Sequence, residues 1–77
     1  MYQANTEIRK AAKKANISLW EIALELGISE ATMTRKMRCE LSEEYKKKVL
    51  TIIDKLQAER LNAVIEKMKE EGVLNNG

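Results

Sequence analysis

The stretch ISLWEIALELGISEATMTRKMR, residues 17–38, contains a helix start, a helix stop and a second helix start in close succession. Ser18 and Glu21 match the S-x-x-E capping box, in which a hydroxyl and a carboxylate each satisfy a free backbone N–H group at the start of a helix. Gly27 supplies the left-handed backbone conformation that ends a helix at the least steric cost. The stretch therefore predicts a helix that begins just after Ser18 and stops at Gly27.

A second helix follows almost at once. Ser29 is a typical N-cap residue, and Glu30 is favourable at the positively polarised start of a helix. Met33 and Met37 lie one turn apart on the same side, which suits residues that anchor a helix in a core. We expect this helix to run from Glu30 to Arg38. The residues left for its outer side are mostly small or polar: Ser29, Glu30, Ala31, Thr34, Arg35 and Arg38.

Helices are also predicted on both sides of this stretch. Upstream, apolar residues recur at helical spacing from Asn5 to Ala15, with Asn5 or Thr6 as the cap. Downstream, Ser42 is placed to cap a long helix, because no glycine or proline occurs between it and Gly72. Such a helix would contain about 29 residues and measure ~43 Å.

The long helix carries two apolar stripes, offset from each other by roughly 120°. The first consists of Tyr45, Val49, Ile52, Ile53 and Leu56, and the second of Leu50, Leu61, Val64, Ile65 and Met68. The helix is longer than a 77-residue globule is wide, so its second half should project from the domain or bend back near residues 57–59. Gly72 should end it through a Schellman turn in which Val73 contacts Met68.

The composition is typical of an all-helical protein of one domain. Proline is absent, glycine occurs three times in 77 residues, and the formal net charge is +2. The charge excess lies in residues 1–42, which hold seven basic and five acidic side chains, whereas residues 43–77 hold seven of each. This small excess excludes a uniform basic field, so the distribution of charge must carry any argument for nucleic-acid binding.

Several classes of function find no support in the residues present. The chain has no histidine and a single cysteine, Cys39, so neither an internal disulfide nor a Cys/His zinc site can form. It has no glycine-rich phosphate loop and too little mass for a deep pocket, and we expect no enzyme activity, no cofactor, no metal and no small-molecule substrate. No apolar run is long enough for a membrane helix or a signal sequence. We therefore expect a soluble, cytoplasmic protein.

Two capped helices joined by a glycine-containing turn are the helix-turn-helix arrangement, in which the second helix enters the DNA major groove. With its flanking helices, the stretch resembles the lambda-repressor-like, Cro/CI-type (XRE-like) helix-turn-helix proteins, in the short variety common on bacterial phages and conjugative elements. The resemblance covers residues 5–58. Its strongest marks are Ala23, Gly27, Ile28 and Met33.

The sequence departs from the residue pattern of this family at one position. Lys36 stands where such domains usually carry an apolar residue, and Met37 is predicted to take that packing role. Residues 59–77 match nothing in the family. We expect them to form a helical extension that serves in dimerisation through four apolar side chains: Leu61, Val64, Ile65 and Met68.

The resemblance implies which residues would meet DNA. Base contacts would come from Ser29, Glu30, Ala31, Thr34 and Arg35, and backbone contacts from Ser18, Trp20, Thr32, Lys36 and Arg38. Arg35 is the strongest candidate for base reading, because a guanidinium can pair bidentately with guanine. The alternative for Arg35 is a solvated surface arginine, and that for Glu30 is a simple partner of the helix dipole. For Trp20, packing against the first helix or the chain end is the alternative to a phosphate contact.

Two functional hypotheses follow from the sequence. The first is a sequence-specific regulator of double-stranded DNA in the bacterial cytoplasm, a repressor or an excision accessory factor. As a homodimer it would place two recognition helices ~34 Å apart on a near-palindromic site. The second is a protein-interaction module, an antirepressor or a recombination accessory factor, that binds its partner through the Leu61–Met68 stripe. The low net charge favours the second hypothesis, because non-specific affinity for DNA depends on neutralised phosphates.

Overall fold

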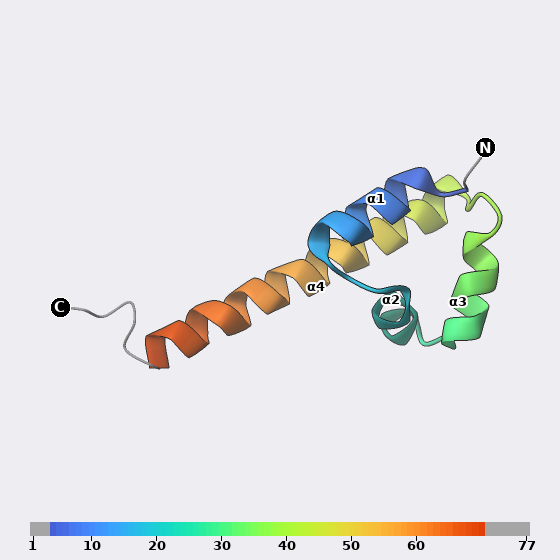
Figure 1. Cartoon of the computed structure of the whole chain (residues 1–77). Coiled ribbons are helices and arrows are strands. Elements are labelled where there is room, and N and C mark those ends of the chain that lie inside the picture. The colour runs from blue at the N-terminus through green and yellow to red at the C-terminus, as the bar shows by residue number, and fades with distance from the viewer. Residues whose placement is uncertain (1–3, 71–77) are drawn as a thin grey trace.

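The structure, a computed structural model, describes residues 4–70, and these form four α-helices and no strand (Figure 1). The helices are α1 (Thr6–Ala15), α2 (Leu19–Leu26), α3 (Glu30–Met37) and α4 (Glu43–Glu70). The predicted all-α class is confirmed. The predicted stop at Gly27 and the restart at Glu30 are also found, with Gly27 in the left-handed conformation at φ 75°.

Three short helices surround the first half of α4. Helix α1 lies along α4, α3 stands across the beginning of α4, and α2 packs against both α3 and α4 (Figure 1). One core joins all four helices. Its buried residues are Ile8, Ala12, Ile17, Ile22, Ala23, Met33, Met37, Val49 and Ile53. Both methionines of α3 therefore lie in the core, as their spacing predicts.

Helix α4 continues without a break for 28 residues, about 42 Å. Its second half extends away from the other helices (Figure 1), and the molecule measures 53 × 25 × 20 Å. Of the two alternatives, projection is therefore correct and the bend near residues 57–59 is wrong. The predicted contact of Val73 with Met68 lies outside the described residues. No helix within residues 4–70 is both long and apolar enough to cross a membrane.

The first apolar stripe of α4 faces the core, with Val49 and Ile53 fully buried. Leu50, which the periodicity places on the second stripe, also packs against this core. Because α1 and α2 both contact α4, the buried arc of its first half is wider than the first stripe alone.

The helix starts agree with the expected caps except at α1. The capping box of Ser18 and Glu21 is present, and the backbone N–H of Thr32 and of Tyr45 donate to the hydroxyl oxygens of Ser29 and Ser42. Asn5 precedes α1 but does not cap it with its side chain. It adopts a left-handed conformation, and its amide group binds a distant part of the chain.

Candidate nucleic-acid interface

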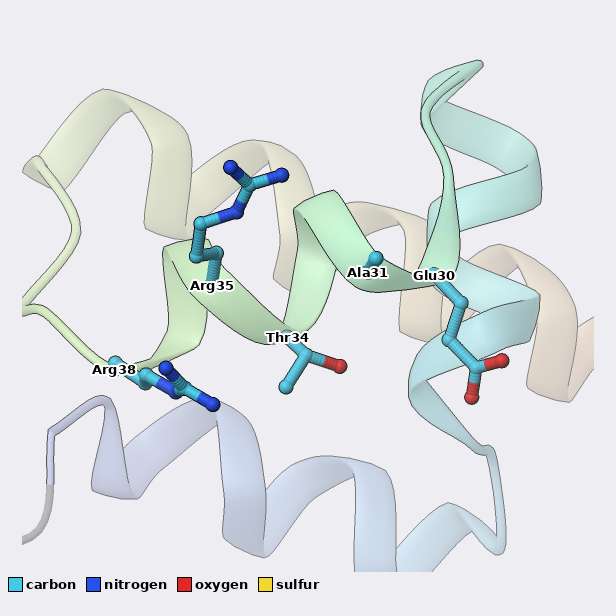
Figure 2. A pocket seen from close by; sticks show the side chains of 5 residues that line it. All are labelled: Glu30, Ala31, Thr34, Arg35 and Arg38. Carbon is cyan, nitrogen blue, oxygen red and sulfur yellow. The ribbon is translucent and has the colours of Figure 1, made fainter.

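The exposed side of α3 carries five residues that line a hollow of about 500 Å³ (Figure 2). These residues are Glu30, Ala31, Thr34, Arg35 and Arg38, and all five are exposed. A spacing of four residues places side chains on the same side of a helix. Glu30, Thr34 and Arg38 thus form one row, and Ala31 and Arg35 form a second row beside it. Four of the five base-contact candidates lie in these two rows.

The two arginines of this hollow are unpaired. Among residues 4–70, the side chains of Arg35 and Arg38 make no hydrogen bond and no ion pair, and Arg35 extends away from Thr34 and Arg38 (Figure 2). The other two arginines both hold the fold together. Arg9 donates to the carbonyl oxygens of Ala4 and Met37 at 2.8 and 3.0 Å, and Arg60 binds at the junction of α1 and α2. The guanidinium groups free to bind a ligand are therefore on α3, at Arg35, and at its C-cap, Arg38.

Ser29 and Thr32 bind each other at the start of α3. The Ser29 hydroxyl donates to Thr32 Oγ1 at 2.8 Å and accepts from the Thr32 backbone N–H at 3.1 Å. One of the two hydroxyl protons is therefore used in this bond, and the other remains free to donate to a ligand.

Lys36 lies on a different side of α3 from the five-residue hollow. Its Nζ sits over the Tyr45 ring, 5.1 Å from the centroid, and Lys36 lines a second hollow of about 460 Å³ with Thr32, Arg35, Cys39, Glu40 and Leu41. Met37 is only 1% exposed, so it takes the packing role predicted for it in place of Lys36. Arg35 borders both hollows and occupies the centre of the exposed side of α3.

The two candidates on α2 have different surroundings. The backbone N–H and hydroxyl of Ser18 both donate to Glu21 Oε2, at 2.8 and 3.0 Å, so Ser18 has no donor left for a phosphate. The Ser18 backbone hydrogen bond is the main cause of a lowered pKa at Glu21, and the Ser18 hydroxyl and Arg60 lower it further against an opposing effect of burial. Glu21 is thus an anion beside Ser18, which is unfavourable for a phosphate. Trp20 is 53% exposed and lies outside the core.

A clamp on the end of α3 was missed by the sequence interpretation. Asn5 Nδ2 donates to the carbonyl oxygens of Met37 and Cys39 at 3.1 and 2.8 Å, and Asn5 Oδ1 accepts from the Leu41 backbone N–H at 2.8 Å. Together with Arg9, it fixes the C-terminal end of the helix that carries Arg35 and Arg38. The only local signal was an asparagine before a helix, and that pattern indicates a cap rather than a contact 32 to 36 residues away.

The four residues predicted to mediate dimerisation lie on the projecting half of α4. Leu61 and Val64 are 60% and 54% exposed, and Ile65 and Met68 are half-buried. Arg60, just before them, binds the Asn16 carbonyl oxygen at 2.6 Å and pairs with Glu21. The projecting half of α4 therefore begins just after Arg60, the last residue of α4 that binds the other helices or their connections in the described chain.

No match was found for this chain in comparisons with known protein families, with curated proteins and with solved structures. In the described part of the chain, no three His, Cys, Asp or Glu side chains are grouped so that they could hold a metal ion.

Proposed function

We propose that this protein is a helix-turn-helix, sequence-specific DNA-binding regulator that inserts α3 into the major groove. One observation carries the proposal: α3 buries Met33 and Met37 completely while its opposite side exposes two unpaired arginines, Arg35 and Arg38. A helix held rigidly on one side, with free guanidinium groups and small side chains on the other, suits a major groove about as wide as one helix.

Both rows on α3 would supply contacts to base edges. Arg35 would pair bidentately with guanine, and Ala31, one turn before it in the same row, would contact a thymine methyl group. Thr34 and Ser29 would each reach a base edge through a hydroxyl group, and Glu30 would accept from cytosine N4.

Phosphate contacts would set the position of α3 without reading sequence. We assign them to Arg38 at the end of α3, to Lys36, which lines the second hollow, and to the Thr32 hydroxyl. Ser18 does not join this set because both its donors bind Glu21.

The protein would act as a homodimer in the bacterial cytoplasm. Two α3 helices about 34 Å apart would read a near-palindromic site. The resemblance to Cro/CI-type proteins favours a repressor or an excision accessory factor of a mobile element. The low net charge of +2 implies weak non-specific binding, so discrimination among sites would depend on base contacts.

Selection of bound sequences from a random duplex pool tests the proposal, and an inverted repeat is the expected result. Arg35→Ala and Arg35→Lys should both lose about tenfold or more of the preference for the selected site, because lysine keeps the charge but cannot pair bidentately. Arg38→Ala should weaken binding to all duplexes alike and reduce the salt dependence by about one phosphate contact. Lys48→Ala, a substitution on the exposed surface of α4, serves as the control.

Two results would contradict the DNA-binding proposal: a selection that recovers no common sequence, or full site preference in Arg35→Ala. Either would favour the second candidate, a protein-interaction module that binds another protein through the Leu61–Met68 stripe. The exposure of Leu61 and Val64 is the observation that supports this candidate. In that case Leu61→Asp should abolish capture of the partner while Arg35→Ala leaves it intact.

A further inference from the structure

Among residues 4–70, Arg9 is the one arginine that is half-buried and has no carboxylate partner. Its side chain donates only to carbonyl oxygens, from Nε to Ala4 at 2.8 Å and from Nη2 to Met37 at 3.0 Å. The cations that join separate parts of the described chain by ion pairs all have a carboxylate beside them: Lys46, Lys55 and Arg60. The charge of Arg9 is therefore the exception.

The hydrogen bonds of Arg9 offset only part of the cost of its burial. A guanidinium group is permanently charged, and moving a charge out of water is unfavourable unless an opposite charge lies beside it. The Met37 carbonyl group supplies a partial negative charge, because it lies at the C-terminal end of α3. Two of the five guanidinium N–H groups bind carbonyls, which leaves three for a ligand. Arg9 thus retains both the charge and the donors that an external anion needs.

A second unpaired arginine lies next to this position. Arg38 directly follows Met37, so the Arg9 guanidinium, bound to the Met37 carbonyl oxygen, lies against the backbone of Arg38. The Arg38 side chain is exposed and makes no ion pair within the described residues, and it extends from the end of α3 towards α1 in Figure 2. Like charges on neighbouring residues repel each other, and an anion between them is attracted by both.

The end of α3 is also where a DNA strand would pass in the proposed complex. Helix α3 has eight residues and is therefore about 12 Å long, which is close to the width of the major groove. A helix of this length in the groove has its ends near the sugar–phosphate strands that border the groove. Arg38 is the C-cap of α3, and Arg9 binds the carbonyl group of its last residue. Both arginines would therefore meet a phosphate rather than a base.

We propose that Arg9 and Arg38 together bind one phosphate group of the DNA backbone. A phosphodiester offers anionic oxygens to which two guanidinium groups can make charge-assisted hydrogen bonds. Because Arg9 also holds the Met37 carbonyl oxygen, the bound phosphate would be tied to the end of α3 and would fix the position of that end in the groove. This inference rests on the proposed function, which supplies the DNA. It gives α1 a contact that the helix-turn-helix resemblance does not include.

The salt dependence of binding to a mixed-sequence duplex tests the proposal, because each neutralised phosphate contributes about 0.9 to the slope of log K against log salt concentration. Arg9→Gln keeps a side-chain N–H donor but loses the charge. It should raise the Kd about fivefold or more at low salt and reduce the slope by about 0.9. Arg9→Lys keeps the charge and should keep most of the slope. Circular dichroism at each salt concentration checks that both variants are folded.

Arg60→Gln is the matched control, because it removes the same charge from an arginine that also holds the fold but pairs with Glu21. Its slope should equal that of the unchanged protein. The double variant Arg9→Gln/Arg38→Gln tests whether one phosphate is shared. A shared phosphate is lost once, so the double variant should lose about as much slope as either single variant, whereas two separate phosphates would give about twice the loss.

Four results would overturn the shared phosphate site. They are an unchanged slope in Arg9→Gln, an equal loss in Arg60→Gln, a loss in Arg9→Lys as large as in Arg9→Gln, and a doubled loss in the double variant. If a selected site is bound but Arg9→Gln leaves the slope unchanged, only this inference fails. If selection recovers no common sequence while the slope still depends on Arg9, only the sequence specificity in the proposed function fails. Absence of binding to any duplex would overturn both.

Discussion

Asn5 is the residue on which the position of α3 most depends. It is 1% exposed and adopts φ 59°, and its side chain satisfies two carbonyl groups and one N–H group between Met37 and Leu41. Asparagine is one of the few residues that tolerate this left-handed conformation. Together with Arg9, which also donates to the Met37 carbonyl oxygen, this side chain joins the start of α1 to the end of α3, and no other residue type offers the same donor and acceptor at that length.

Asn5→Ala should lower the free energy of unfolding by about 2 kcal/mol or more, because it removes the hydrogen bonds to the Cys39 carbonyl and the Leu41 N–H and strains the left-handed conformation. Urea denaturation measures this loss. Asn16→Ala is the matched control, since Asn16 has φ 58° but is exposed and its side chain makes no hydrogen bond within residues 4–70. It should lose only about 1 kcal/mol. Equal losses at the two positions would show that the hydrogen bonds of Asn5 contribute nothing.

At the scale of the elements, the turn between α2 and α3 depends on two small residues for different reasons. A Cβ atom placed on Gly27 would meet nothing within 4 Å, so the turn does not need glycine for space. It needs the positive φ of 75°, which L-amino acids rarely adopt. Ala23, by contrast, is 1% exposed and lies in the core shared with Met33. Close approach of the two helices is therefore set at Ala23 and the direction of the chain at Gly27.

This distinction predicts different costs for substitutions at the two positions. Gly27→Ala should destabilise the protein by about 1 kcal/mol through backbone strain, and Gly27→Asn should cost less, because asparagine tolerates a positive φ. Ala23→Leu should cost about 1–3 kcal/mol through overpacking. Thermal unfolding of the three variants gives the comparison. If Gly27→Asn is as harmful as Gly27→Ala, backbone conformation is not the reason for glycine at this position.

At the scale of the whole molecule, α4 is divided into a packed half and a projecting half. The first half buries Val49 and Ile53 in the common core, and Arg60 is the last residue of α4 with a hydrogen bond to another helix in the described chain. An isolated helix of about ten residues is marginal in water. The projecting half should therefore gain stability from the second subunit of the proposed homodimer.

Hydrogen exchange should detect this dependence. Backbone amides of residues 62–70 should exchange rapidly at low protein concentration and become protected as the proposed homodimer forms, because a second subunit would then cover this half of α4. The amides of Val49 and Ile53 should be protected under both conditions and act as the internal control. Protection of residues 62–70 that does not change with concentration would contradict a concentration-dependent interface on α4.

Local physical chemistry made much of this fold predictable from sequence. Ser18, Ser29 and Ser42 mark helix starts and Gly27 marks a stop, because capping and backbone conformation act over three or four residues. The spacing of Met33 and Met37 identified the buried side of α3 and therefore its exposed side. The residues offered for base contact came from the resemblance to Cro/CI-type proteins, and their contact with DNA stays a prediction.

The contacts that only the tertiary structure decided join residues far apart in the chain. The sequence by itself determined the helices, the breaks between them and the buried side of each, since these depend on neighbouring residues. It did not indicate that Asn5 would bind the end of α3, that Leu50 would join the core, or that Arg60 would tie α4 to Glu21 and Asn16. These contacts span up to 44 residues and depend on how the helices cross. The reason is physical: a hydrogen bond or a packing contact forms wherever the folded chain brings two groups together, and helical periodicity carries no information about which helix will lie opposite.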